Sequence, residues 1–266
     1  MRLHLAALTL GLAVLALPVA GSHAETAPAP SAAIKAAVAA PTRTPANIAR
    51  DTYRHPAETL AFFGVAPGQT ILEYLPGGGW YTEILAPLNR GKGKVYAAQP
   101  SGKAYDALAA KFSADARTYG GVSLVAWPTG AAVPAGSVDT ILTFRNIHNM
   151  VMAGTGEENF RRFFDLLKPG GVLGVVDHRL PEDRDSALEK KSGYLKRSTI
   201  VALATQAGFV LEAESEVNAN PKDTADWPEG VWTLPPTYRL GDVDRAKYAA
   251  IGESDRLTLR FRKPRK

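Results

Sequence analysis

The sequence predicts a single α/β domain built on a mostly parallel β-sheet with helices on both faces. Short apolar segments alternate with helical patterns from about residue 70 to residue 208, which is typical of βαβ units. Glycine-containing turns separate these segments, as at Lys168-Pro169-Gly170-Gly171. With 266 residues, 45% of them hydrophobic, the chain can bury one good core, so a second full domain is not expected.

Seven strands account for the apolar segments, five within the alternating region and two near the C-terminus. They are expected at residues 70–74, 94–98, 122–127, 138–144, 172–177, 209–217 and 256–262. Helices are expected at residues 55–63, 80–89, 103–112, 157–168 and 198–207. The last of these would have Ser198 as its N-cap and would stop at Gly208.

The N-terminus reads as a signal peptide covering residues 1–24. Arg2 precedes an apolar run over residues 5–20, and Ser22-His23-Ala24 forms a small-residue cleavage site. An uncleaved anchor is the alternative, but the run is shorter than the roughly 20 apolar residues that a spanning helix needs. We therefore expect an exported protein without a stable membrane anchor, periplasmic if the source is a bacterium with two membranes. Cysteine is absent, which excludes disulfides and thiolate metal sites.

Two further segments differ in composition from the alternating region. Residues 25–47 are rich in Ala, Pro, Thr and Ser, which predicts a flexible leader before a domain spanning residues 48–266. Residues 218–254 carry several prolines together with Trp227, Trp232 and Tyr238, and so form an insertion that is too aromatic for a disordered linker. This insertion is either a lid over a substrate site or a packed excursion at the sheet edge.

The charge pattern does not indicate a nucleic-acid partner. The net charge is +5, and the basic residues are scattered except in the C-terminal tail, which we expect to be a solvated end. A small-molecule partner is expected instead, and the oligomeric state cannot be read from the sequence.

A glycine cluster follows the first strand, where ligands bind in open parallel sheets. Gly77, Gly78 and Gly79 would let backbone N–H groups approach a ligand closely, and the next helix N-terminus favours an anionic group. The dinucleotide fingerprint would need glycine at position 82, which is Thr82. Neither a phosphate-binding loop of the G-x-x-x-x-G-K-[ST] type nor a G-x-S-x-G elbow occurs in the sequence, which disfavours common dehydrogenases, P-loop NTPases and serine hydrolases.

Residues 71–85 resemble motif I of class I S-adenosylmethionine-dependent methyltransferases, in which an acidic residue, here Glu73, precedes a glycine-rich loop. Residues 94–99, 136–141 and 167–173 match further segments of that family. The resemblance extends from about Arg50 to the C-terminus, and the closest subgroup is predicted methyltransferases with signal peptides. It implies a Rossmann-like class I methyltransferase fold and an enzyme that methylates a small or medium-sized acceptor.

The resemblance also implies which residues bind S-adenosylmethionine. The glycine loop would contact the methionine part of the cofactor, and Gln99 stands where a carboxylate usually binds the ribose hydroxyls. The implied cofactor residues are Glu73, Gly77, Gly78, Gly79, Tyr81 and Gln99. The sequence departs from the family at Gln99, at Leu75, which replaces the first glycine of motif I, and at Thr129, where an acidic residue often meets the adenine. A non-catalytic ligand-binding protein with the same fold is therefore the alternative.

Polar residues at the ends of the fourth and fifth strands are the expected reaction site. Asn146 and His148 follow one strand, and Asp177 and His178 end the other. Either histidine could act as a general base, with Asp177 orienting it, although a lone histidine more often has a structural role. Arg145 and Arg179 could hold an anionic group, or pair with nearby carboxylates. His148, Asp177 and His178 could also bind a metal, but no spacing motif supports one, and no metal is assigned.

Overall fold

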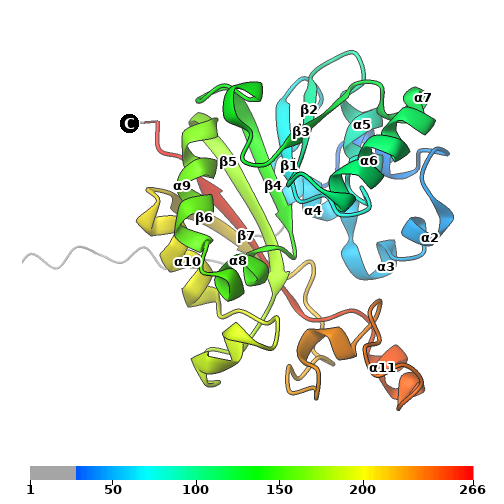
Figure 1. Ribbon diagram of the computed structural model, residues 1–266, viewed down its shortest axis with the longest axis vertical. Helices are drawn as coiled ribbons and strands as arrows, with labels where there is room; N and C mark the ends of the chain where they lie inside the picture. Colours follow the sequence, from blue (N-terminus) through cyan, green and yellow to red (C-terminus); the bar gives the residue numbers. More distant parts are fainter. Residues whose placement is uncertain (1–27, 266) are drawn as a thin grey trace, which may run out of the picture.

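The protein is built around a seven-stranded sheet with the strand order β3-β2-β1-β4-β5-β7-β6 (Figure 1). The computed structural model describes residues 28–265, so the predicted signal peptide lies outside the described residues. Strands β1 to β5 pair in parallel, while β7 runs antiparallel to both β5 and β6. The strands are β1 Thr70–Tyr74, β2 Lys94–Gln99, β3 Val122–Ala126, β4 Val138–Phe144, β5 Leu167–His178, β6 Val210–Ser215 and β7 Arg256–Arg262. The predicted α/β class and mostly parallel sheet are confirmed.

Helices cover both faces of this sheet. They are α1 Ala32–Val38, α2 Pro45–Ile48, α3 Asp51–Arg54, α4 Pro56–Phe62, α5 Thr82–Asn89, α6 Lys103–Ala114, α7 Ala116–Tyr119, α8 Ile147–Ala153, α9 Gly156–Leu166, α10 Arg197–Gln206 and α11 Arg245–Ile251. Helices α9 and α10 bury Phe160, Phe163 and Ile200 against one face, whereas α1, α4 and α5 cover the other. Successive side chains of β1 point to opposite faces of the sheet. Leu72 therefore belongs to the core beneath α9 and α10, and Ile71 to the core beneath α1, α4 and α5.

The turn predicted before the fifth strand lies inside β5. Val138 pairs with Leu167 and Thr140 with Val172, so residues 168–171 are displaced from the regular register. Gly170 has a φ of 79°, a left-handed conformation that glycine adopts without strain. The N-cap predicted at Ser198 is wrong, because α10 starts at Arg197 and Ser198 instead bonds Glu182 through its N–H and hydroxyl.

The expectation of a flexible leader at 25–47 does not hold for its described part. Residues 32–38 form α1. Its Ile34 and Ala37 are 2% and 4% exposed, within the core beneath α1, α4 and α5, here called the α5-side core. Beyond α1, the Thr44 N–H and hydroxyl both donate to Glu83. Alanine favours helix formation, and an alanine-rich helix with one isoleucine on its apolar face can pack against a core. The composition of the segment does not reveal this, because it does not show which residues face the core.

The insertion at 218–254 packs as a folded unit beside the carboxyl end of the sheet, below β5 in Figure 1, where α11 is orange. Asp223 accepts hydrogen bonds from the Tyr194 hydroxyl, the Trp227 indole N–H and the Asp255 N–H. The C-terminal tail is also less solvated than expected, since Arg260 and Arg262 in β7 pair with Glu212. Within residues 28–265, no helix has both the length and the apolar character that crossing a membrane requires.

Candidate functional site

Two cavities lie at the carboxyl ends of the parallel strands. The first, here called the loop cavity, has a volume of about 230 Å³ and lies between the glycine loop, the end of β4 and the N-terminal helices. It is lined by Asn47, Arg50, Arg54, Glu73, Leu75, Pro76, Gly77, Gly78, Trp80, Tyr81, Phe144, Arg145 and Asn146. The second, here called the histidine cavity, has a volume of about 210 Å³. It is lined by Arg145, His148, Asn149, His178, Val231, Trp232, Pro235, Pro236 and Thr237. Arg145 belongs to both.

The glycine loop presents bare backbone to the loop cavity. A Cβ atom added at Gly77 or Gly78 would meet open space, and Gly77 has a φ of 59° that favours glycine. Gly79 lies deeper, with a Cβ position 3.6 Å from Thr82 and Lys111. The Lys111 ammonium donates to the Gly78 carbonyl at 2.7 Å and fixes the outer side of the loop to α6. The loop can therefore approach a ligand through main-chain atoms alone.

Glu73 is a buried carboxylate at the floor of the loop cavity. It is 2% exposed and accepts a hydrogen bond of 2.6 Å from the Thr82 hydroxyl at the start of α5. Burial raises the pKa of Glu73 to about 7, although the Thr82 hydrogen bond and the Lys111 charge act in the opposite direction. Tyr81 stacks on Phe144 with ring centroids 3.5 Å apart, and forms a flat aromatic wall beside Glu73.

Leu75 and Gln99 are two of the positions where the sequence departs from the methyltransferase family, and of these two only Leu75 lines the loop cavity. Leu75 has a φ of 50°, which is left-handed and costly for a side chain with a Cβ. Leu75 lines the loop cavity, and its side chain packs against the core that contains Leu72, Phe160 and Phe163. Gln99, at the end of β2, is not among the residues that line the loop cavity. Its buried Oε1 accepts no hydrogen bond from the described part of the chain.

Arginines that the sequence did not single out surround the loop cavity. Arg50 and Arg54 reach it from the N-terminal segment, and both pair with Glu253 at the end of the insertion, at 2.6 and 3.1 Å. Arg256 joins the same carboxylate at 3.2 Å. Burial lowers the pKa of Arg54 to about 9, helped by the charge of Arg145. The buried Nη2 of Arg54 has no hydrogen-bond partner among residues 28–265.

His148 and Asp177, both expected at the site, form a buried pair beside the histidine cavity. His148 occupies the first turn of α8, a helix that the sequence reading missed, and its Nδ1 lies 2.8 Å from Asp177 Oδ1. Asp177 also accepts the backbone N–H groups of Ile147, His148 and His178, at 2.6, 3.1 and 2.8 Å. Because Asp177 acts as an acceptor throughout, His148 Nδ1 carries a proton, which leaves Nε2 as the ring nitrogen able to take one up.

His178 and Asn146 complete the set of expected polar residues. His178 lies with its ring centroid 5.1 Å from that of His148, and its Nδ1 is 2.5 Å from the Ser254 hydroxyl. Burial and the positive charges around it hold the pKa of His178 well below its usual value, so this ring is neutral at pH 7. Asn146 lines the loop cavity and donates to the Tyr74 carbonyl at 3.0 Å, which ties the end of β4 to the end of β1.

The three groups that could hold a metal are close together but are engaged elsewhere. Ligand atoms of His148, Asp177 and His178 lie within 4.8 Å of one another. Both oxygens of Asp177 already accept hydrogen bonds, and the positive charge of Arg145 lies on the same cavity. These contacts make Asp177 an orienting group for His148 rather than an open ligand, and they favour an anion over a cation beside the imidazoles.

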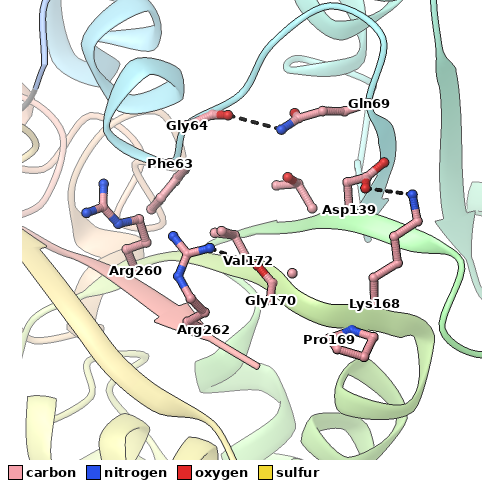
Figure 2. A pocket seen from close by; sticks show the side chains of 12 residues that line it. Phe63, Gly64, Gln69, Asp139, Lys168, Pro169, Gly170, Val172, Arg260 and Arg262 are labelled. Atoms are coloured by element: carbon pink, nitrogen blue, oxygen red, sulfur yellow. Dashed lines mark hydrogen bonds and ion pairs between the residues drawn. The ribbon is translucent and has the colours of Figure 1, made fainter. Parts of the chain in front are cut away.

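Arg179, which the sequence offers as a holder of an anionic group, lies elsewhere, as does the nearby Tyr194. Arg179 pairs with Glu216 and Asp255, and Tyr194 is fully buried with its hydroxyl on Asp223. A separate cavity of about 270 Å³ lies at the opposite edge of the sheet, around Gly170 (Figure 2). There Lys168 is paired with Asp139, as Figure 2 shows. Arg260 and Arg262 share the carboxylate of Glu212, so each cation at this cavity already has an acidic partner.

Comparisons of the sequence alone find no relative. No family model matches the chain, and no curated protein matches it. Comparison of the structure does find similar proteins. A methyltransferase from Aquifex aeolicus that depends on S-adenosylmethionine has a TM-score of 0.57 at 17% identity, covering 81% of this chain and 93% of that protein. An arsenic(III) S-adenosylmethionine methyltransferase from Chlamydomonas reinhardtii has a TM-score of 0.52 at 16% identity, covering 89% of this chain and 74% of that protein.

A [4+2]-cyclase, SpnF, is also similar, with a TM-score of 0.56 at 15% identity, covering 87% of this chain and 91% of the cyclase. These similarities, together with the strand order and the antiparallel β7, show that the chain has the class I methyltransferase fold. A fold shared by methyltransferases and a cyclase does not by itself decide the reaction.

Proposed function

We propose that this protein is an exported S-adenosylmethionine-dependent methyltransferase that acts on a small or medium-sized acceptor. The observation that carries the proposal is the pair of adjoining cavities at the carboxyl edge of this fold. One is lined by the glycine loop and Glu73, and the other by the Asp177-oriented imidazole of His148. A cofactor site next to a site for proton removal is what methylation of a protonated acceptor requires.

The residues around the loop cavity fit most of such a cofactor. Gly77 and Gly78 leave room for it, and Glu73 offers a carboxylate to its positively charged part. The guanidinium groups of Arg50 and Arg54 would hold its carboxylate, which suits the unbonded Nη2 of Arg54. Gln99 fits less well, because its unbonded Oε1, which could accept a ribose hydroxyl, is buried outside the lining of the loop cavity. Leu75 also fits poorly, because it lines the cavity where the family usually has a glycine.

When bound, S-adenosylmethionine would supply a methyl group on a sulfonium, which an acceptor lone pair can displace in line. The chain's own residues would position the acceptor and remove its proton. Nε2 of His148 would take that proton, and Asp177 would stabilise the resulting imidazolium through the Nδ1 hydrogen bond. His178, neutral because of its buried and electropositive surroundings, could donate to or accept from the acceptor without adding charge.

Calorimetric titration of the mature protein with S-adenosylmethionine and S-adenosylhomocysteine tests this proposal directly. We expect both to bind, and we expect Gly77→Val to abolish the binding, because a branched side chain would enter the open space beside the loop. The matched control is Gly136→Val, which also replaces a left-handed glycine but lies away from both cavities. If the wild-type protein gives no heat of binding with either ligand at millimolar concentration, the proposal is wrong.

The second candidate is a binding protein that keeps the fold without transferring methyl groups. It is favoured by Leu75 in the cavity lining and by the position of Gln99 outside it. In that case the protein should fail to bind either form of the cofactor while still binding another small molecule in the histidine cavity.

Export is proposed from the sequence of residues 1–24. We expect the mature protein to begin at Glu25, which intact-mass measurement of protein secreted through its own leader would reveal. A mass that retains the first 24 residues would contradict it.

A further inference from the structure

Arg145 carries a charge that the protein itself leaves unpaired. It is the first residue after β4, and its guanidinium makes no hydrogen bond or ion pair with any residue of the described chain, although the charges of Glu253 and Asp177 act on it. Glu253 is bonded to Arg50 and Arg54, and Asp177 to His148 and backbone N–H groups, so neither is free for Arg145. Burial lowers the pKa of Arg145 to about 10, which leaves it charged at neutral pH.

The backbone at Arg145 is held in an uncommon conformation. Its φ is 62°, a left-handed angle that is unfavourable for a residue with a Cβ. The Arg145 N–H donates to the Val176 carbonyl at 2.6 Å, which attaches this turn to β5. The turn directs the chain from the end of β4 into α8 and leaves the guanidinium on the boundary between the two cavities. Backbone strain at such a place commonly accompanies a functional role.

The histidine cavity is cationic on one side and apolar on the other. Its lining contains Arg145 and two imidazoles but no carboxylate side chain. The opposite wall comes from the insertion, through Val231, Trp232 and the pair of prolines at 235 and 236. Trp232 lies edge-on to His148, with ring centroids 6.2 Å apart. At about 210 Å³, the cavity is smaller than most drug-sized ligand sites, so its occupant is small.

We propose that the histidine cavity binds a small carboxylate with an apolar body, held by the guanidinium of Arg145 and packed against Trp232. A half-buried guanidinium that lacks a counter-ion within the described chain gains from a bound carboxylate through charge-assisted hydrogen bonds. The binding specificity stands on the cavity alone. Its further role as the methyl acceptor, with His148 facing the group to be methylated, rests on the function proposed above.

A matched pair of probes separates charge from shape. We expect 4-hydroxybenzoate to bind the mature protein and the neutral isostere 4-hydroxybenzamide to bind at least about tenfold more weakly, as measured by calorimetry at constant ionic strength. Acetate and inorganic phosphate, titrated in competition, report whether the anionic group alone is recognised. The inference is overturned if no anion of this set binds, or if the benzoate and the amide bind equally.

Variants locate the site. Arg145→Gln should weaken benzoate binding about tenfold or more and leave the amide unchanged, whereas Arg145→Lys should retain part of the benzoate binding. Arg161→Gln, on the exposed face of α9, is the matched control and should change neither. Unchanged benzoate binding in a folded Arg145→Gln protein would overturn the proposal. Benzoate binding that needs added Zn²⁺ would do so as well, because the imidazoles and a metal would then hold the anion.

Cofactor titrations keep this test distinct from that of the proposed function. If S-adenosylhomocysteine does not bind while benzoate binds through Arg145, the methyltransferase proposal fails and the carboxylate site stands. If the cofactor binds and benzoate does not, the carboxylate site is ruled out and the methyltransferase proposal stands.

Discussion

Glu73 is a carboxylate whose ionisation the folded protein resists. Burial raises its pKa from an ordinary value of 4.5 to about 7, so between these pH values the folded state holds a proton that the unfolded state has released. The contribution of Glu73 to stability is therefore fully present below pH 4.5 and is lost as the pH rises through 7. The loss amounts to at most about 3 kcal/mol, less where bound cations or water relieve the burial.

Replacing Glu73 with glutamine should remove this pH dependence. The glutamine side chain stays neutral, so Glu73→Gln should unfold at a higher urea concentration than the wild-type protein at pH 8 and at a similar one at pH 4.5. Urea denaturation of both proteins across this pH range gives the difference in their unfolding free energies at each pH. All other titrating groups are the same in the two proteins, so their contributions cancel from this difference. A constant difference at every pH would contradict the assignment. If Glu73 also faces a cationic ligand, the same variant should bind S-adenosylmethionine more weakly.

Leu75 combines a strained backbone with a position in the lining of the loop cavity. Leu75→Gly should relieve the left-handed strain, worth roughly 1–2 kcal/mol, and lose apolar packing of about the same size, so stability should change little. The cavity should widen and the affinity for S-adenosylhomocysteine should rise several-fold. Leu75→Ala, which keeps the strain and loses most of the packing, is the control and should be less stable. An equal or lower affinity in the glycine variant would show that Leu75 does not obstruct the cofactor.

At the scale of elements, Asp177 connects the end of β5 to the start of α8. It accepts the N–H groups of Ile147 and His148, the first two residues of that helix, while also holding the His148 ring. A carboxylate at a helix N-terminus is favoured by the helix dipole and satisfies donors that otherwise lack partners. One side chain therefore fixes both the helix and the imidazole that it carries.

Asp177→Asn should weaken this connection. The amide has one acceptor oxygen and places its NH₂ group against existing donors, so we expect a loss of roughly 2–3 kcal/mol in unfolding free energy. Amide hydrogen exchange should accelerate first in α8. Asp139→Asn is the matched control, because Asp139 accepts from Thr70 N–H and Lys168 in a partly exposed position. Its loss should be smaller, and equal losses in the two variants would argue against a special role for Asp177.

The sequence predicts the central elements well because their signals are local. The strands expected at 70–74, 138–144 and 256–262 have the observed bounds, since each is a short apolar or β-branched run between turn residues. Helix α8 was not predicted from the sequence, and the Asn146 side chain at its N-cap position makes no capping hydrogen bond but donates to the Tyr74 carbonyl. Its cap is Asp177, 30 residues from Ile147, so only tertiary structure supplies it.

The site residues also divide into those with a local sequence signal and those that only tertiary structure brings to the site. Glu73 and the glycines follow a motif that is continuous in sequence, and His148, Asp177 and His178 lie at strand ends that the parallel topology brings together. Arg50, Arg54 and Ser254 have no such signal. Arg50 and Arg54 reach the loop cavity from the N-terminal segment, and Ser254 bonds His178 from the insertion. The packing of both regions depends on contacts between distant parts of the sequence, as between Arg54 and Glu253 at a separation of 199 residues.

At the scale of the whole molecule, chain regions outside the central fold complete both cavities. The N-terminal segment contributes Asn47, Arg50 and Arg54 to the loop cavity, and the insertion contributes Trp232 and its neighbours to the histidine cavity. Glu253 joins these two regions through its ion pairs with Arg50 and Arg54. The shape of each cavity therefore depends on how these two regions pack against the central fold.

Removing residues 25–49 should therefore affect both stability and binding. A chain that starts at Arg50 lacks α1, whose Ile34 and Ala37 are buried in the α5-side core, and lacks the bonds from Thr44 to Glu83. We expect it to lose roughly 3–5 kcal/mol in urea unfolding relative to a chain that starts at Glu25, because an apolar face of the core becomes exposed. Its affinity for S-adenosylhomocysteine should also fall, because Asn47 and the support of Arg50 are lost.

Ile34→Ala separates these two effects. It should lose roughly 2–4 kcal/mol through the cavity left in the core, yet retain cofactor affinity, because Asn47, Arg50 and Arg54 stay in place. If the chain starting at Arg50 unfolds at the same urea concentration as the longer one, the helix does not contribute to the fold. If Ile34→Ala loses as much affinity as the truncation, the N-terminal segment acts through stability alone and not through the residues that it brings to the cavity.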